Sequence, residues 1–305
     1  MSALRSSPSD ETGEPGGGPY RPALAQARGR LGRLGSTIIF YSTVGSTNDV
    51  AASLARDWLR VHRFDRLDPE GAVIVAGEQT AGRGRRGHAW ISPAGSGLYV
   101  SVVLTPSRAV LDPQRAVRLL TLAAGLAIVE AIEAATGLTA DLKWPNDVYA
   151  GSRKLAGILA EAVTGESTTV PPVVVGYGIN VLAGAWPPEL AHRATSLEAE
   201  LGRRVERDQL FVETLAALAR RYDDLLAGRF DAILDAWRRR STSASGARVT
   251  WTDASGEQSG VTAGIDNQGA LLVRVGEHME RIVAGELQWE IQSTGGVRLQ
   301  PGGTP

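Results

Sequence analysis

The stretch TAGRGRRGHAW, residues 80–90, places three arginines among three glycines and ends on a tryptophan. Glycines let a backbone approach a ligand closely and present its N–H groups. Arginine guanidinium groups pair with phosphate or carboxylate through two parallel hydrogen bonds. The composition therefore predicts a flexible loop that closes over an anionic ligand. Two alternatives are a solvated charge cluster, the commonest fate of such a run, and a nucleic-acid patch.

Several familiar phosphate-binding and nucleic-acid motifs do not fit this loop. It lacks the Gly-Lys-Ser/Thr ending of a Walker A loop, and no strand–GxGxxG–helix context with a following acidic residue is present. An RNA-binding Arg/Gly segment usually repeats, whereas this one occurs once. Trp90 is typical of a core residue or a loop wall, and less so of a stacking surface for a ring.

Lysine usage marks a second region. Of the 32 basic residues only Lys143 and Lys154 are lysines, and both fall within one twelve-residue stretch. Genomic base composition with two chance lysines is one explanation. The other is that both sites need a compact ammonium, which the planar guanidinium of arginine does not replace everywhere.

The motifs around these lysines favour chemistry on a carboxylate and a phosphate. A lysine on a strand that faces a pocket, such as Lys154 in RKLAGIL, can bridge both groups, which is the charge pattern that an acyl-adenylate needs. Gly157 lets that strand pass close to something bulky. The bland alternatives are a solvated strand-edge lysine, an Asx-turn at Asn146 and Asp147, and a plain turn at GYGIN (176–180).

Composition limits the class of protein. The 305 residues are 43% apolar, and the net charge of −1 argues against wholesale nucleic-acid binding. The chain has no cysteine, and its four scattered histidines form no metal-ligand spacing. No apolar run approaches the roughly 20 residues that span a bilayer, and no signal peptide is visible. We therefore expect a cytoplasmic protein.

Hydrophobic periodicity predicts a mixed α/β core followed by a small β module. Residues 1–36 resemble a disordered lead with no core to bury. After Ser245, short strands at close spacing predict a small all-β module. The intervening chain predicts strands in residues 36–41, 71–79, 97–106 and 173–182, two strands around a turn in 140–163, and helices in 50–61, 113–136, 208–227 and 230–240.

Five motifs in order carry a resemblance to the biotin protein ligases, also called biotin–[acetyl-CoA-carboxylase] ligases. They are GSTND (45–49), EQTAGRGRRGHAW (78–90), LKWPNDV (142–148), RKLAGIL (153–159) and GYGIN (176–180). The resemblance implies an α+β fold, in which a central mixed sheet with helices, like that of class II synthetases, precedes an SH3-like barrel. Composition and the resemblance together give the expected domains: a disordered lead at 1–36, a catalytic domain at 37–243, the barrel at 244–292 and a flexible tail at 293–305.

The resemblance also implies a two-step reaction. Biotin and MgATP give biotinyl-5′-AMP and pyrophosphate, and the mixed anhydride then acylates one lysine of a biotin carboxyl carrier domain of acetyl-CoA or a related acyl-CoA carboxylase. A cation aimed at the developing charge is typically worth about 3 kcal/mol in such a step. Closure of the loop would keep water from the anhydride.

Residue roles follow from the resemblance position by position. Arg85 and Lys154 are implied to be catalytic, and Lys154 contacts both the biotin carboxylate and the α-phosphate. Asp147 is the implied Mg²⁺ ligand. The implied biotin-binding residues are Ser46, Thr47, Asn48, Gln79, Gly82, Arg83, Gly84, Arg85, Trp90 and Lys154. The implied ATP or adenylate-binding residues are Arg85, Lys143, Asn146, Asp147 and Asn180.

The sequence departs from part of the family at its beginning. Some of these ligases carry an N-terminal winged helix-turn-helix, and nothing before residue 38 is expected to fold that way. We therefore expect no repressor activity and neither nucleic acid nor membrane as a partner; a homodimer is compatible with the sequence. The alternatives are a lipoate or octanoate ligase of the same catalytic fold, a catalytically inactive biotin or nucleotide sensor, and an RNA-binding protein.

Overall fold

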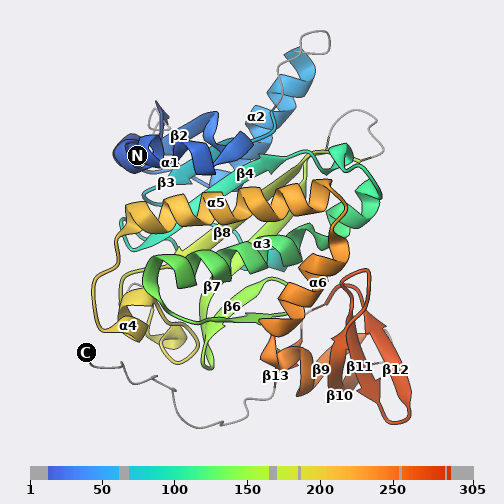
Figure 1. The fold of residues 1–305 in the computed structure, drawn as a ribbon. Coiled ribbons are helices and arrows are strands. Elements are labelled where there is room, and N and C mark those ends of the chain that lie inside the picture. The colour runs from blue at the N-terminus through green and yellow to red at the C-terminus, as the bar shows by residue number, and fades with distance from the viewer. Residues whose placement is uncertain are drawn as a thin grey trace, which may run out of the picture.

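The computed structural model describes residues 13–61, 69–164, 170–184, 187–253, 256–285 and 287–289. The predicted flexible tail at 293–305 and the first twelve residues of the predicted lead lie outside these ranges. Within them, an eight-stranded sheet carries the helices and a five-stranded sheet follows at the C-terminal end (Figure 1).

The large sheet is mixed, as predicted. Strands β2 and β3 pair in parallel, and every other neighbouring pair is antiparallel. In spatial order the strands are β1 (Glu14–Pro15), β2 (Thr37–Tyr41), β3 (Ala72–Ala76), β4 (Gly97–Leu104), β8 (Val173–Asn180), β7 (Arg153–Ala162), β6 (Asp147–Ala150) and β5 (Asp141–Lys143). All residues of β3 and β4 are buried, which explains their continuous apolar sequences.

Helices cover both faces of this sheet. Helices α3 (Pro113–Thr136) and α5 (Arg207–Leu226) run side by side over one face (Figure 1). Helix α2 (Thr47–Val61) packs on the other, because Ile74 and Val174 join its apolar cluster while Val73 and Val175 join the cluster of α3 and α5. Successive residues of a strand point to opposite faces. Odd-numbered side chains of β4 and even-numbered side chains of β8 therefore face α2.

Helix α3 is apolar enough, by length and composition alone, to cross a membrane, contrary to the sequence-based expectation. Its most apolar window is 72% buried inside the protein. It begins at an Asp112 cap that accepts a hydrogen bond from the Arg115 N–H, and ends at Gly137 in the left-handed conformation (φ 77°). These features are typical of the core helix of a globular domain.

The C-terminal module is an antiparallel five-stranded sheet, which agrees with the predicted SH3-like unit. Its spatial order is β12 (His278–Ile282), β11 (Leu271–Val275), β10 (Gly256–Ile265), β9 (Ser245–Asp253) and β13 (Gln288–Trp289). Helix α6 (Phe230–Arg239) leads into it. The module contacts the catalytic domain through the turn after β10, where the Trp144 indole donates to the Gly269 carbonyl at 2.9 Å and Arg118 donates to Gln268 at 2.8 Å.

Residues 13–36 correct the prediction of a disordered lead. They form β1, helix α1 (Arg21–Ala27) and three 3₁₀ turns, and they bury Tyr20, Leu24, Leu31 and Leu34 in the main core. The apolar residues of this segment are too sparse to show a clear period in the sequence. They still hold the segment in a folded conformation, because they pack against α5 and the edge of the sheet. The expected domain boundary at residue 37 thus divides a segment that packs as part of the catalytic domain.

Two smaller differences concern the middle of the chain. Residues 140–163 hold three strands instead of two, since AGS after β6 makes a second tight turn with Gly151 at φ 57°. A short helix, α4 (Leu197–Leu201), was not predicted. Its Ser196 cap accepts a hydrogen bond from the Ala199 N–H. The helix is only five residues long, so its sequence shows no clear helical period.

Candidate active site

A row of cross-strand partners forms the floor of the site on the α2 face. Gly178 of β8 pairs with Gly157 of β7, which pairs with Asp147 of β6, which in turn pairs with Lys143 of β5. Residues directly opposite one another in antiparallel strands share a face of the sheet. Two glycines therefore leave a bare patch of backbone, flanked on one side by a carboxylate and an ammonium.

The Trp90 indole lies over this bare patch. A Cβ added to Gly178 would stand 2.2 Å from Trp90 Nε1, and one added to Gly157 would stand 3.0 Å from Trp90 Cζ3. Neither glycine has a positive φ, so lack of space for a side chain is the reason that glycine is needed at both positions. The indole N–H is buried and has no hydrogen-bond acceptor among the described residues. Trp90 thus lies over the glycine patch with an unused donor, and its role as a wall of a ligand site stays a prediction.

A β-bulge brings Lys154 to the same face as Gly157. The two residues are three apart, so regular alternation would place them on opposite faces. The register changes between Val148, which pairs with Ala156, and Tyr149, which pairs with Lys154. The residue between, Leu155, is the extra one, and bulges of this kind redirect side chains beside active sites. Lys154 Nζ consequently lies 5.5 Å from the centroid of the Trp90 ring.

Lys154 and Asp147 form an ion pair on this floor. Lys154 Nζ is 2.7 Å from Asp147 Oδ1, and both side chains are partly buried. Within the described ranges, Asp147 Oδ1 has no well-directed hydrogen bond, although it is shielded from solvent. A partly desolvated pair without further hydrogen bonds is held less firmly than a fully bonded one. Lys154 can therefore leave the pair to bind an anion that enters the site, and Asp147 can leave it to bind a cation.

Buried polar groups gather where α2 begins. Ser46, Thr47 and Asn48 are 3–5% exposed. The backbone N–H and hydroxyl of Thr47 both donate to Gln79 Oε1, at 2.9 and 3.0 Å. The Ser101 hydroxyl, from β4, lies 2.7 Å from Thr47 Oγ1 and 2.6 Å from Asn48 Oδ1 and donates toward both. Three predicted biotin-binding residues, Thr47, Asn48 and Gln79, are thus joined by hydrogen bonds through Thr47 and Ser101. Together with the adjacent buried Ser46 we call them the polar pocket.

Glu161 connects the polar pocket with the arginine loop. Its Oε2 accepts from the Asn48 amide at 2.7 Å and from the Arg83 guanidinium at 2.8 Å. Asp49 also pairs with Arg83 at 2.8 Å. The backbone beneath is again glycine, because a Cβ on Gly176 would stand 2.0 Å from Asn48 Oδ1. Arg83 is therefore held by two carboxylates beside the polar pocket.

The arginine loop is folded back on itself. The Trp90 N–H donates to the Gly82 carbonyl at 2.9 Å, and the Gly84 N–H donates to His88 at 2.7 Å. Arg86, at its tip, has a positive φ of 54°, a conformation that is uncommon outside glycine. Gly82 accepts and Gly84 donates a backbone hydrogen bond within the loop, and the close approach of their backbone to a ligand stays a prediction.

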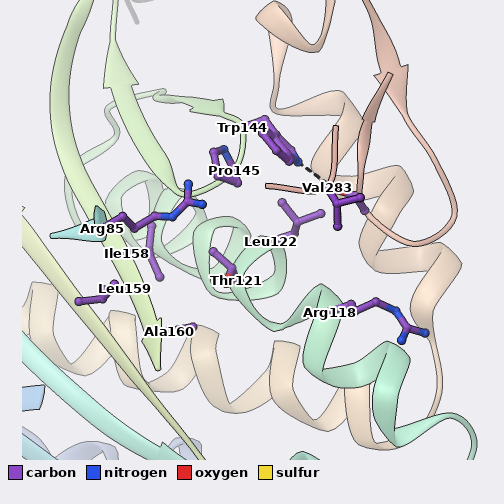
Figure 2. Close-up of a pocket in the computed structure, with 11 residues that line it drawn as sticks. Arg85, Arg118, Thr121, Leu122, Trp144, Pro145, Ile158, Leu159, Ala160 and Val283 are labelled. Carbon is purple, nitrogen blue, oxygen red and sulfur yellow. Dashed lines mark hydrogen bonds between the residues drawn. The ribbon is translucent and has the colours of Figure 1, made fainter. Parts of the chain in front are cut away.

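Arg85 reaches from the loop to the KWPND turn. Its Nη1 donates to Asn146 Oδ1 at 3.2 Å, and Asn146 Nδ2 in turn donates to the Ile158 carbonyl at 2.8 Å. Figure 2 shows the Arg85 side chain extending toward Pro145 across a cavity of about 230 Å³. The cavity is lined by Arg85, Arg118, Thr121, Leu122, Trp144, Pro145, Ile158, Leu159, Ala160, Gly269 and Val283.

The remaining predicted nucleotide residues flank Lys154 on both sides. Asn180 donates to the Thr195 carbonyl at 2.9 Å, and the Thr195 N–H donates to the Lys154 carbonyl at 2.9 Å. Lys143 lies beyond Asp147, with its ammonium over the Tyr149 ring. Burial raises the pKa of Tyr149 to about 12, helped by the charge of Asp147. The phenol therefore stays neutral at physiological pH.

Sequence reasoning missed several residues of the site. Ser101 carried a signal, since it is the only serine or threonine in the apolar strand GLYVSVVL. Glu161, Tyr149 and Trp289 carried none, because ordinary surface and core positions use the same residue types. The alternative of a solvated strand-edge Lys154 does not hold, since its ammonium faces both Asp147 and the Trp90 ring.

Asp147 is a suitable ligand for a magnesium ion, but the ion also needs ligands that the protein does not provide. Mg²⁺ usually takes one or two carboxylates and completes its octahedron with water and phosphate oxygens. Asp147 Oδ1 is a buried oxygen without a hydrogen bond from the described part of the chain. Among those same residues, no group of three or more His, Cys, Asp or Glu side chains gathers as a metal site. The donor set suits an ion that arrives with a phosphate ligand.

Comparisons with known proteins agree with this geometry. The sequence profile of the biotin/lipoate A/B protein ligase family matches residues 53–180. The bifunctional ligase/repressor BirA of Bacillus spizizenii is 33% identical over 257 residues, which cover 84% of this chain and 74% of that protein. The biotin–[acetyl-CoA-carboxylase] ligase of Paracoccus denitrificans is 37% identical over 71% of this chain and 89% of its own length.

A solved structure extends the agreement to the fold. Biotin protein ligase from Aquifex aeolicus, in complex with biotin and ATP, superposes with a TM-score of 0.68 at 27% identity, covering 84% of this chain and 99% of that one. The chain therefore belongs to the biotin/lipoate A/B protein ligase family, and within it to the biotin protein ligases.

Proposed function

We propose that this chain activates biotin with ATP and transfers it to a lysine of a carrier protein. The observation that carries the proposal is the position of Lys154. Its ammonium lies between Trp90 and Asp147, with the polar pocket on one side and Asn146, Asp147 and Lys143 on the other. One cation therefore faces both a pocket for a polar organic ring and a segment suited to a nucleotide.

Biotin fits the polar pocket through its ureido group. A ureido ring offers two N–H donors and one carbonyl acceptor. Ser46, Thr47 and Asn48 with Gln79 offer the complementary hydroxyl and amide groups in a buried setting, where each pairing is strengthened and each unpaired group is costly. Trp90, which packs on the bare backbone of Gly157 and Gly178, would line the apolar part of the molecule from that side. The carboxylate end would then meet Lys154.

The first chemical step joins that carboxylate to the α-phosphate. A carboxylate oxygen forms a bond to the α-phosphorus, and the bond from this phosphorus to the bridging oxygen of the β-phosphate breaks, which releases pyrophosphate. Lys154 and Arg85 would hold the negative oxygens together and stabilise the charge that gathers on them. Magnesium held by Asp147 would neutralise phosphate charge when bound.

The second step transfers the acyl group. The amine of a carrier lysine attacks the biotinyl carbonyl, the bond to the AMP oxygen breaks, and the amine loses a proton as the amide forms. Until then the loop of Arg83 and Arg85 would shield the anhydride from water. We propose a biotin carboxyl carrier domain as the acceptor, which is supported by the acetyl-CoA-carboxylase ligase named in Paracoccus denitrificans. We place the reaction in the cytoplasm, where ATP and the unmodified carrier are present.

The test is biotin-dependent pyrophosphate release from MgATP, with lipoate and octanoate in parallel. We expect release with biotin alone, followed by a mass increase of an apo carrier domain by one biotinyl group. Release with lipoate or octanoate instead would assign the chain to the lipoate side of the family. Binding of biotin without pyrophosphate release would indicate a sensor and overturn the proposed catalysis.

A further inference from the structure

The ammonium of Lys143 lies beside two aromatic rings at the edge of the site. It lies on β5, the edge strand, directly opposite Asp147. Its Nζ is 4.1 Å from the centroid of the Tyr149 ring and 5.2 Å from that of Trp289. In the described part of the chain, no hydrogen bond or ion pair involves this ammonium. Three N–H donors are therefore available beside the nucleotide segment.

The two rings make this arrangement tolerable. An ammonium that loses water without gaining hydrogen bonds is costly, and aromatic faces return only part of that cost. Burial is the main cause that lowers the pKa of Lys143, and the nearby charge of Lys154 lowers it further, while Asp147 raises it. A phosphate that entered beside Lys143 would supply the missing acceptor and gain from a charge that is already fixed in place.

One of the two rings belongs to the C-terminal module. Trp289 is the last described residue of β13, where it pairs with Val249 of β9. Its side chain is partly buried and packs against the main core. Tyr149, by contrast, comes from β6 of the catalytic sheet, on the same strand as Asp147. The small module therefore supplies one side of the enclosure around a lysine of the catalytic domain.

We propose that Trp289 is a positioning residue, through which the C-terminal module holds Lys143 ready for the phosphates of ATP. The inference rests on the proposed function and adds to it, since neither the five motifs nor the polar pocket includes any residue beyond Asn180. It also gives the C-terminal sheet a part in the first half-reaction. Trp289 itself need not touch the nucleotide, because it acts by limiting the positions that the ammonium can occupy.

The experiment compares four full-length variants with the wild type: Trp289→Ala, Trp289→Phe, Lys143→Met and the double variant Trp289→Ala/Lys143→Met. We expect Trp289→Ala to raise KM for MgATP about 3- to 30-fold, the range of a cation–π contact that loses one ring. KM for biotin should change less than about twofold by the same reasoning, because the polar pocket is untouched. Trp289→Phe keeps an aromatic face and should restore most of the affinity for ATP.

The double variant separates positioning from general loosening. Once Lys143 is methionine, loss of Trp289 should add less than about a twofold effect, since the two changes remove one interaction. Leu287→Ala is the matched control, because Leu287 directly precedes β13, is also partly buried against the main core and carries no aromatic ring. Equal losses for ATP and biotin, failure of phenylalanine to rescue, or an undiminished effect in the Lys143→Met background would overturn the proposal.

A direct measurement of ATP binding distinguishes failure of the proposed function from failure of the role proposed for Trp289. MgATP binding to the wild type and to Trp289→Ala is measured by calorimetry, independently of turnover. A wild type that binds ATP but releases no pyrophosphate with biotin would overturn the proposed catalysis, while weaker ATP binding by Trp289→Ala would still support the role of Trp289. Equal ATP affinities in these two proteins would overturn that role even if the wild type is an active ligase.

Discussion

Gly178→Ala tests whether Trp90 and the bare glycine patch form the biotin site. The added Cβ would lie 2.2 Å from Trp90 Nε1 and 2.6 Å from Cε2. Contacts of this kind need roughly 3.4 Å, so the indole must move by about 1 Å or more, and overpacking on this scale costs about 1–3 kcal/mol. Because Trp90 lies at the end of a glycine-rich loop, the ring can swing away in the free protein. The cost should therefore appear when the loop closes on biotin.

The expected result is a loss of biotin affinity with little loss of stability. A cost of about 1–3 kcal/mol corresponds to a roughly 5- to 150-fold rise in Kd, measured by titration calorimetry. Gly29→Ala is the control, since its Cβ would meet nothing within 4 Å. In a Trp90→Ala background the alanine at 178 should have no further effect. Wild-type biotin affinity in Gly178→Ala, or an equal loss without Trp90, would refute the steric argument.

Three further substitutions address other parts of the molecule. Lys154→Met should reduce biotin-dependent pyrophosphate release by about 100-fold or more, since one preorganised charge donor is worth about 3 kcal/mol; near wild-type release would contradict its assignment. Arg85→Gly removes the contact to Asn146 and should let adenylate escape, which is measured as biotin on bystander lysines. Burial tends to raise the pKa of Asp266, but hydrogen bonds from Arg281 and from the Ala270 and Gln268 N–H groups outweigh it and hold the pKa below 3.8. Asp266→Asn should thus lower the free energy of unfolding above pH 3.8, and the gap to wild type should shrink as the pH falls further; a gap that persists at low pH would contradict this.

The sequence was most informative where one physical pattern dominated. The long apolar period of residues 113–136 predicted α3 to the residue, and the apolar runs around Val73 and Val175 predicted strands. Dense motifs likewise placed Lys154, Asp147 and the polar pocket in one neighbourhood. In each case the local conformation, burial and chemistry favour the same residue types, so one sequence pattern is enough to predict the element or the site.

The rest depended on contacts between distant segments. Tyr20 and Leu34 look like isolated apolar residues in a polar lead, and only their fit against the core shows that they are buried. The bulge at Leu155 could not be predicted either, because it is defined by the register with β6. Trp289 is more than 140 residues from Lys143 along the chain, and nothing in either segment indicates their contact. Such features are tertiary, and a single sequence does not encode them in any local pattern.

The ion pairs within the site also set a limit on how tightly substrates can bind. Arg83 is occupied by Asp49 and Glu161, and Lys154 by Asp147. A ligand that takes over Arg83 or Lys154 must first break these pairs, so only the difference between old and new contacts appears as affinity. The exchange also frees carboxylates that magnesium or an incoming amine can use. Ion pairs that can be exchanged in this way therefore suit a site that must bind charged ligands and still release its product to the carrier.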